Sequence, residues 1–382
     1  MRVLHVITGL GIGGAEQQLR LLLRHLPVQG RVVTLTNPGA VATGIESDGT
    51  PVTHLGMAGN RDVGALPRLA RIVRQGRYDL VHTHLYRACV YGRTAARLAG
   101  VRPVIATEHS LGETQIEGRP LSAGTRALYL ASERLGTSTV AVSPSVARRL
   151  ADWGVPPDRI RIVPNGIETD RFAFDTDARR RARGVLGLPE DAYVVGGVGR
   201  LTPGKRFERL VHAVAAIPDV RLLLVGEGEH RAELLRTARA CGAADRVLLA
   251  GACEDPPGPG TSGPSLPELL AAMDVFVSTS PDETFGLAVV EALAAGLPVL
   301  YVACPAVDDL APEAAPGARR IGGSVPELIS ALRGVHGVRP ARFPLPAAAR
   351  RYDIAHSAQQ LMSLYDQAVH GTLPREVREP VR

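Results

Sequence analysis

The segment GRLTPGKRFE, from Gly199 to Glu208, contains Lys205, which is the only lysine of a chain with 43 arginines. It follows the apolar run YVVGGV, so Arg200 and Lys205 are expected on a turn between a strand and a helix. The start of a helix favours an anion, and an arginine fork beside a compact ammonium can neutralise a departing diphosphate. The spacing therefore predicts a diphosphate-binding turn.

A second segment whose residues could take part in binding or catalysis is STSPDETFGLAVVEALAAGLPVL. In it, Glu283 and Glu291 are eight residues apart. Phe285, Gly286 and Leu287 lie where a helix is expected to begin, and the backbone N–H groups there could hold a phosphate. Glu283 could accept hydrogen bonds from sugar hydroxyls. Glu291 lies on an apolar helix face, so it needs a hydroxylated partner such as a ribose.

The third segment is GLGIGGAE, in which Gly9, Gly11 and Gly14 satisfy the G-x-G-x-x-G pattern of dinucleotide binding. That pattern requires an acidic residue at the end of the second strand, but residues 34–37 read TLTN. A backbone cradle for a phosphate or a substrate is therefore favoured. NAD binding and simple helix packing remain as alternatives.

Short apolar runs alternate with helical patterns through both halves of the chain, which is typical of parallel sheets covered by helices. The predicted strands are RVLHVIT, RVVTLT, PVTHL, DLVHTH, PVIATEH and STVAVS, then YVVGGVGR, VRLLLVG, RVLLAG, DVFVSTS and LPVLYVA. The fold class is α/β, with two doubly wound parallel sheets. Ligands of such sheets bind beyond the carboxyl ends of the strands, and two facing sheets would form a cleft there.

At 382 residues, the chain is long enough for two domains. Residues 168–190 contain Pro, Gly and dense charge without a strong period, so the junction is expected there. The predicted domains are residues 1–170 and 171–350, and a last amphipathic helix at about 351–370 is expected to return to the first domain. The segment DPPGPGTSGPS, residues 255–265, is predicted to be an inserted loop.

The composition favours a cytoplasmic protein. Four cysteines without paired spacing argue against both a disulfide framework and a zinc site, and no apolar segment is a membrane span. The net charge of +6 is concentrated in residues 1–170, which have 20 arginines against 13 acidic residues. A basic half of this kind can attract an acidic substrate or contact an anionic membrane peripherally. Nucleic-acid binding is not indicated, because the sequence has no basic stripe rich in aromatic residues.

A D-x-D pattern, Asp175 to Asp177, matches a known metal-binding motif. It lies in the expected junction and not at the end of a strand, so no metal site is predicted there.

Five segments occur together in a characteristic order: GGAE near the start, VPNGI at residues 163–167, GRL-x-x-G-K, VGEGE at 225–229, and E-x7-E with FGL inside it. This order resembles the retaining glycosyltransferases of family 4, which have the GT-B fold, and the resemblance covers nearly the whole chain. The sequence departs from the family after Glu291, where YVACPAVDDL lacks the usual Gly-Gly turn, and at the 255–265 insertion.

The resemblance implies a role for individual residues. Arg200 and Lys205 would bind the donor diphosphate, and Glu283 would bind the sugar hydroxyls. The backbone of Phe285, Gly286 and Leu287 would contact the phosphate and sugar, and Glu291 the ribose. The remaining implied site residues are Gly13 and Gly14, which would approach the phosphate or acceptor, Glu227 and Gly228, which would line the nucleotide pocket, and His109, which matches the active-site histidine.

The implied function is metal-independent transfer of a hexosyl group from a UDP- or GDP-linked sugar to a hydroxyl acceptor, with retention and without a cofactor. The acceptor would contact residues 111–121, in envelope glycan or natural-product glycosylation. An NDP-sugar epimerase of the same fold and an NAD-dependent oxidoreductase are the alternatives. The sequence indicates no oligomeric state.

Overall fold

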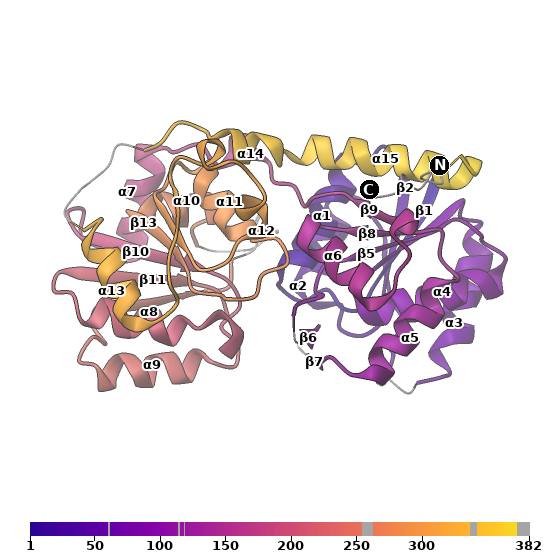
Figure 1. Cartoon of the computed structure of the whole chain (residues 1–382), viewed down its shortest axis with the longest axis horizontal. Coiled ribbons are helices and arrows are strands. Elements are labelled where there is room, and N and C mark those ends of the chain that lie inside the picture. Colours follow the sequence, from indigo (N-terminus) through magenta and orange to yellow (C-terminus); the bar gives the residue numbers. More distant parts are fainter. Residues whose placement is uncertain (60–61, 114, 118, 254–262, 337–341, 373–382) are drawn as a thin grey trace, which may run out of the picture. The chain divides into compact units, whose positions relative to one another are not determined.

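The computed structural model describes residues 1–372 except 60–61, 114, 118, 254–262 and 337–341. The chain forms two compact units (Figure 1). The N-terminal unit consists of Met1–Asn165 and Ile354–Arg382, and the C-terminal unit consists of Gly166–Asp353. Most of the 255–265 insertion, which the sequence analysis predicted to be a loop, lies outside the described residues.

The N-terminal unit is built on a parallel sheet of seven strands in the order β3-β2-β1-β4-β5-β8-β9. Its strands are β1 (Arg2–Ile7), β2 (Gln29–Thr34), β3 (Val52–His54), β4 (Leu80–His84), β5 (Val104–Glu108), β8 (Ser138–Ala141) and β9 (Ile160–Ile162). The first six were predicted, and β9 was not. A two-stranded antiparallel hairpin, β6 (Gln115–Ile116) and β7 (Arg119–Pro120), lies beyond β5.

Helices cover both faces of this sheet, because its central strands are apolar on both sides. The helices of the unit are α1 (Gly14–His25), α2 (Gly39–Ser47), α3 (Ala65–Gly76), α4 (Tyr86–Ala99), α5 (Ala123–Glu133), α6 (Pro144–Trp153) and α15 (Ile354–His370). The α3 and α4 helices pack against Val6 and Val81. On the opposite face, α15 buries Leu361 and Tyr365 against Val3 and Leu80, so this helix is part of the N-terminal unit.

The C-terminal unit has a second parallel sheet, of six strands in the order β12-β11-β10-β13-β14-β15. The strands are β10 (Tyr193–Val198), β11 (Val220–Val225), β12 (Val247–Gly251), β13 (Val275–Ser278), β14 (Val299–Tyr301) and β15 (Ala318–Arg320). All except β15 were predicted. The helices are α7 (Thr176–Val185), α8 (Phe207–Ala215), α9 (Arg231–Ala240), α10 (Leu266–Ala272), α11 (Leu287–Ala294), α12 (Pro305–Asp308), α13 (Val325–Arg333) and α14 (Ala347–Arg351).

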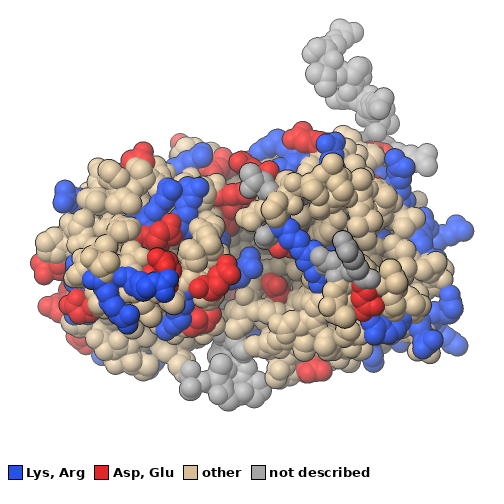
Figure 2. Space-filling model, turned by 90° about the horizontal axis from the view of Figure 1, so that it is seen from below, with Lys and Arg blue, Asp and Glu red and all other residues tan. Residues whose placement is uncertain are grey.

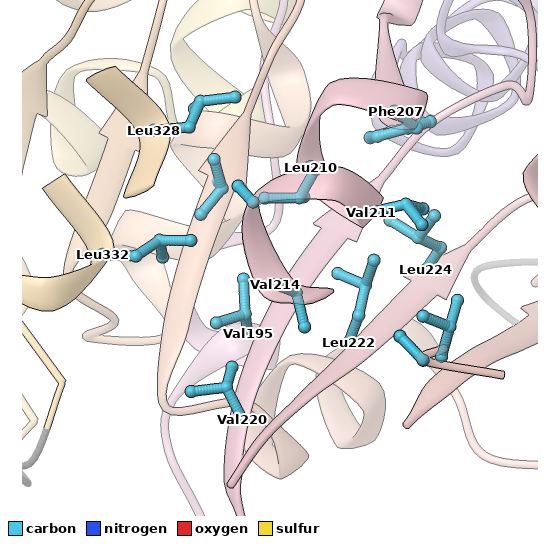
Figure 3. Packing of buried hydrophobic residues seen from close by; sticks show 14 of the residues in the cluster. Val195, Phe207, Leu210, Val211, Val214, Val220, Leu222, Leu224, Leu328 and Leu332 are labelled. Carbon is cyan, nitrogen blue, oxygen red and sulfur yellow. The ribbon is translucent and has the colours of Figure 1, made fainter. Parts of the chain in front are cut away.

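The core of this unit lies between the sheet and the helices α8, α9 and α13. Figure 3 shows Val214 of α8 between Val195 and Leu222 of the central strands, and Leu210 of α8 belongs to the same cluster. Because β10 and α8 are fixed by this apolar packing, the turn between them has a defined position. That turn carries Arg200 and Lys205.

Residues 168–190, where the domain junction was expected, contain the helix α7. Asp175 caps this helix by accepting hydrogen bonds from the backbone N–H groups of Asp177 and Ala178, at 3.0 and 3.2 Å. The first carboxylate of the D-x-D pattern therefore has a structural role as a helix cap. The helix is tied to the rest of the unit by Arg183, whose buried guanidinium donates to Asp274 at 2.8 Å.

Among the described residues, no helix combines the length and the apolar character that a membrane span requires.

Candidate active site

The structure brings Lys205 and Glu283 together at the carboxyl edge of the second sheet. Lys205 lies on a 3-10 turn, Pro203–Lys205, between β10 and α8, and Glu283 lies on the loop from β13 to α11. The Lys205 ammonium forms an ion pair with Oε1 of Glu283. Thr279 fixes the turn by donating its hydroxyl hydrogen to the Lys205 carbonyl at 2.6 Å. The ion pair is partly exposed, with 28% of the lysine side chain and 15% of the glutamate side chain accessible to solvent.

Two loops meet beside this pair, and their backbones are in direct contact. The N–H of Leu201, after β10, donates to the Glu227 carbonyl, after β11, at 2.9 Å, and the His230 N–H donates to the Leu201 carbonyl at 3.0 Å. Gly228 is required by this approach, since a Cβ added there would lie 2.3 Å from the Leu201 carbonyl oxygen. The loop after β10, which carries Arg200, and the loop after β11, which carries Glu227, are therefore fixed side by side and form one continuous surface.

Gly228→Ala is expected to lower the stability of the C-terminal unit by roughly 2 kcal/mol, because the new methyl group would overlap backbone that cannot rotate away. Thermal unfolding followed by calorimetry would measure the change. The matched control is Gly184→Ala, in helix α7 of the same unit, where an added Cβ meets no atom within 4 Å. The control should be neutral or stabilising by about 0.5 to 1 kcal/mol, and equal losses in both variants would contradict the prediction.

The start of α11 contains the three residues predicted to contact phosphate and sugar. Gly286 is the residue before the helix, with φ of 98°, and a Cβ there would lie 2.5 Å from the Cys304 sulfur. Phe285 is buried, and its ring lies 4.9 Å edge-on from that of Tyr352. Leu287 begins the helix, and Glu291, one turn further along, is partly buried, so it is more accessible than the sequence analysis expected.

Arg200 and Glu227 are exposed at the same edge of the sheet. Arg200 forms no ion pair with any residue that the structure describes. Glu227 pairs with Arg231 of α9, with Oε1 accepting from Nη1 at 2.9 Å. Arg200 is thus a cation beside the Lys205 turn that no carboxylate among the described residues neutralises.

The glycine-rich loop of the N-terminal unit connects β1 to α1. Gly13 is extended and precedes Gly14, the first residue of α1, and its carbonyl accepts from Gln17 N–H at 3.0 Å. The loop is held by the segment after β2, because Leu10 N–H donates to the Asn37 carbonyl at 2.7 Å. Gly13 and Gly14 therefore lie at the carboxyl edge of the first sheet.

His109 follows β5 at the same edge of the first sheet and is 7% exposed. Its Nε2 lies 3.3 Å from Nδ1 of His84, a hydrogen-bonding distance. Three further histidines, His5, His82 and His84, are fully buried beside it. The sequence analysis did not single them out, although His-x-His at the end of the DLVHTH run was the available signal.

Glu108, directly before His109, is a fully buried carboxyl group. Burial raises the pKa of Glu108 to about 7, against the lowering effect of hydrogen bonds from the Ser110 N–H at 3.1 Å and the Ser110 hydroxyl at 3.2 Å. This residue was not predicted, since a single Glu at the end of a strand carries no distinguishing pattern.

The predicted site residues are thus divided between the two units. Those of the C-terminal unit form one surface, containing an exposed arginine, a lysine–glutamate pair and the start of a helix, which together suit a phosphorylated sugar. Those of the N-terminal unit lie at the carboxyl edge of the first sheet, where ligands of doubly wound sheets bind.

Comparison with known families gives two adjoining matches. Residues 12–171 match Glycosyltransferase Family 4, and residues 178–319 match Glycosyl transferases group 1. The two segments meet near the boundary between the units and together span most of both sheets.

Several characterised relatives have similar sequences. The D-inositol 3-phosphate glycosyltransferase of Xylanimonas cellulosilytica is 30% identical over 320 residues, which are 77% of this chain and 73% of the relative. The UDP-Gal:alpha-D-GlcNAc-diphosphoundecaprenol alpha-1,3-galactosyltransferase of Escherichia coli is 30% identical over 250 residues, 63% of this chain. The chain spans 62% of the E. coli enzyme and 54% of the D-inositol 3-phosphate glycosyltransferase of Acidothermus cellulolyticus.

Solved structures of the same architecture cover the whole length. Anabaena HepE in complex with UDP-glucose superposes with a TM-score of 0.81, at 25% identity, covering 96% of this chain and 100% of HepE. The sucrose-phosphate synthase of Thermosynechococcus elongatus superposes with a TM-score of 0.76 at 22% identity. The superposition covers 97% of this chain and 100% of the synthase chain.

The two parallel-sheet units define a protein of the GT-B glycosyltransferase fold. The chain belongs to glycosyltransferase family 4, as its segment order indicated. The Gly9, Gly11 and Gly14 pattern therefore belongs to a chain of this family, and the oxidoreductase alternative is set aside.

Proposed function

We propose that the protein transfers a hexosyl group from a nucleoside-diphosphate sugar to a hydroxyl acceptor, with retention of the anomeric configuration. The observation that carries this proposal is the surface formed by Lys205, Glu283 and the neighbouring Arg200 and Gly228 loops. A composition that uses arginine at 43 positions keeps its one lysine in contact with a glutamate at the carboxyl edge of a sheet.

A uridine-linked donor is favoured over a guanosine-linked one. HepE was solved with UDP-glucose, and the E. coli relative is named as a UDP-galactose-dependent enzyme. That relative's name also gives an acceptor sugar on diphosphoundecaprenol, which favours an envelope glycan over a natural product as the acceptor. Other relatives are named for D-inositol 3-phosphate, so the acceptor class is a phosphorylated polyol or glycan.

In the proposed reaction, the bond between the anomeric carbon and the diphosphate oxygen breaks, and a bond to the acceptor oxygen forms on the same face. The acceptor's hydroxyl proton passes to an oxygen of the departing diphosphate. Lys205 and Arg200 stabilise the negative charge that develops on that diphosphate. The diphosphate would draw the ammonium away from Glu283, which then accepts hydrogen bonds from the sugar hydroxyls.

Metal independence belongs to the same proposal, since two cationic side chains can take the role that a divalent ion has at a diphosphate. In the D-x-D pattern, Asp175 is a helix cap, and Asp177 forms an ion pair with Arg180 at 2.8 Å.

The subcellular location stays a prediction from composition. Figure 2 shows arginine side chains along the outer edge of the N-terminal unit, in agreement with the basic charge of residues 1–170. A cytoplasmic enzyme that contacts an anionic membrane surface would suit an acceptor linked to a lipid diphosphate. Flotation with phosphatidylglycerol vesicles, compared with phosphatidylcholine vesicles, would test this contact.

Nucleoside diphosphates provide the first test of the donor site. UDP at about 100 times its dissociation constant is expected to raise the free energy of unfolding by about 2.7 kcal/mol, in the presence of EDTA. GDP, ADP, dTDP and NADH are the comparison ligands, and Lys205→Ala is the comparison protein. Stabilisation that requires a divalent metal, or that NADH alone produces, would contradict the proposal.

An analysis of the reaction products distinguishes glycosyl transfer from epimerisation of the donor sugar. Incubation with UDP-glucose or UDP-galactose should release UDP only when an acceptor hydroxyl is present, and the anomeric proton of the product should show the donor's configuration by NMR. A free epimerised sugar formed without acceptor would support the epimerase alternative instead.

A further inference from the structure

The turn from Phe285 to Leu287, whose backbone is expected to contact the phosphate and sugar, is held by a neighbouring loop of the same unit. The Phe285 carbonyl accepts hydrogen bonds from the Ala306 N–H at 2.9 Å and from the Cys304 thiol at 3.4 Å. The thiol also fills the space beside Gly286, where an added Cβ would lie 2.5 Å from the sulfur. The carbonyl of Phe285 therefore points toward the start of α12.

The direction of this carbonyl determines the direction of the next N–H group. A trans peptide unit is planar, and its C=O and N–H bonds point in opposite directions. Because the C=O of Phe285 points toward Ala306, the N–H of Gly286 points away from α12. An N–H group there, at the start of the eight-residue helix α11, can donate to a phosphate oxygen. The bond from Ala306 thus orients an N–H group of the expected donor site.

The loop that supplies this bond is itself fixed. It is the segment YVACPAVDDL, where the sequence lacks the Gly-Gly turn of the family and where Pro305 instead begins α12. Asp308 ties the start of this helix to its end, because Oδ2 accepts from the Cys304 N–H at 3.1 Å. Oδ1 of the same carboxylate accepts from the Tyr301 hydroxyl of β14, also at 3.1 Å. The start of α12 is therefore a firm support for the Phe285 carbonyl.

Tyr352, which follows α14, contacts both residues of the bond between Ala306 and Phe285. Its hydroxyl donates to the Ala306 carbonyl at 2.9 Å, and its ring lies edge-on to that of Phe285, with 4.9 Å between the ring centroids. Tyr352 is buried, with 5% of its surface exposed. Burial raises the pKa of Tyr352, so the hydroxyl keeps its hydrogen near neutral pH and remains a donor.

We infer that Tyr352 is a positioning residue of the donor site, which directs the Gly286 N–H toward the donor diphosphate by holding Phe285 and Ala306 together. The inference rests on the proposed function, because it assumes that this turn binds a diphosphate. Tyr352 acts through Phe285 and Ala306 and does not itself touch the donor. Its replacement should therefore change nucleotide affinity as well as stability, whereas an ordinary core residue changes stability alone.

A matched control lies in the same unit, at the opposite end of β10 from the Lys205 turn. Tyr193 is 7% exposed, and its hydroxyl donates to the Val335 carbonyl at 2.9 Å. Its ring lies edge-on to that of His336, with 5.1 Å between the ring centroids. Tyr352→Phe and Tyr193→Phe each remove one hydrogen bond from a buried hydroxyl to a carbonyl, so the unfolding temperature should fall by similar amounts.

The first measurement is amide hydrogen exchange by mass spectrometry, without any ligand. The N–H groups of Val289 and Val290 donate to the Gly286 carbonyl at 3.0 and 3.3 Å, so their exchange reports how firmly the turn is held. We expect exchange at these two residues to be about 3- to 10-fold faster in Tyr352→Phe than in the wild-type protein. In Tyr193→Phe we expect the wild-type rate.

The second measurement is the dissociation constant of UDP, by titration calorimetry in the presence of EDTA. We expect UDP to bind about 3- to 10-fold more weakly to Tyr352→Phe, which retains the ring but loses the hydroxyl. Tyr352→Leu also loses the contact with the Phe285 ring, so its loss of affinity should be larger. Tyr193→Phe should bind UDP with wild-type affinity.

Equal exchange rates at Val289 and Val290 in Tyr352→Phe and Tyr193→Phe would overturn the inference. Wild-type UDP affinity in both Tyr352→Phe and Tyr352→Leu would overturn it as well. A wild-type protein that binds neither UDP nor another nucleoside diphosphate would overturn the proposed function alone. The exchange measurement needs no ligand, so it still decides whether Tyr352 holds the turn.

Discussion

Lys205→Ala is expected to lower the kcat of glycosyl transfer by about 100- to 1,000-fold, while the protein remains folded. The large effect follows from the position of the ammonium at the place where charge develops on the diphosphate, because removing one such group typically has this effect. The fold should survive because the ion pair with Glu283 is partly exposed, and such pairs contribute little to stability. Initial rates with a UDP-sugar, together with the unfolding temperature, test both parts.

Two matched variants sharpen this experiment. Arg236→Ala removes the cation of another ion pair of the C-terminal unit, with Glu233 on α9, and should leave kcat unchanged. Lys205→Arg retains the charge but replaces the compact ammonium with a planar guanidinium of different reach and geometry. We expect Lys205→Arg to restore activity only in part. Wild-type rates in Lys205→Ala would show that the lysine has no role in the transfer.

Much of the fold was predictable because its central strands are buried on both faces and form continuous apolar runs, such as LLLV in β11. Two strands were not predicted, and both lie at an edge of a sheet: β9, Ile160–Ile162, and β15, Ala318–Arg320. Their sequences, IRI and ARR, are short and partly exposed, so they show neither a run nor an alternation. Pairing with a neighbouring strand, which sequence patterns do not report, makes them strands.

The helix α7 was missed for a related reason. Its sequence TDARRRARGV contains four arginines among ten residues, and it buries mainly Ala178, Ala182 and Arg183. A buried arginine that pairs with Asp274 takes the place of the apolar stripe on which helix prediction depends. The one local signal was Asp175 as a helix cap, which the sequence analysis considered only as part of a D-x-D pattern.

The candidate site was predictable where it follows from strand ends, as for Arg200 and Lys205 after β10. The contact of Lys205 with Glu283 was not, because 78 residues separate them and only the parallel order β10-β13 brings their loops together. The cluster of buried histidines at His5, His82, His84 and His109 has the same origin. His5 and His82 are directly opposite each other in the β1–β4 pairing, a register that no single segment contains.

Acidification is expected to destabilise the N-terminal unit steeply, because four buried histidines must gain protons when it unfolds. Burial lowers the pKa of His5 to about 3 and of His109 to about 4, and the pKa values of His82 and His84 are also well below the usual value. The unfolded chain therefore binds more protons below about pH 6.5, so the free energy of unfolding falls with falling pH. Between pH 6.5 and pH 5, each histidine should lower the free energy of unfolding by about 2 kcal/mol.

Glu108 works in the opposite direction, because its pKa is raised to about 7 in the folded protein. At pH values between the pKa of Glu108 in the unfolded chain and pH 7, the folded state holds one proton more than the unfolded state. Glu108 therefore raises the free energy of unfolding by about 2 to 3 kcal/mol as the pH falls from about 7 to 5. Four histidines against one glutamate leave a net uptake of about three protons on unfolding. The expected slope is about 4 kcal/mol per pH unit between pH 6 and 5.

Trp153 makes this slope measurable, since it is the only tryptophan of the chain and is buried in the N-terminal unit. Urea unfolding followed by its fluorescence at several pH values gives the free energy directly. His5→Phe removes one histidine and should lower the slope by about one proton, or about 1.4 kcal/mol per pH unit. The control is His356→Gln, an exposed position of α15 in the same unit, which should leave the slope unchanged. A stability that stays flat from pH 6.5 to 5 would mean that the buried histidines are not held neutral by the fold.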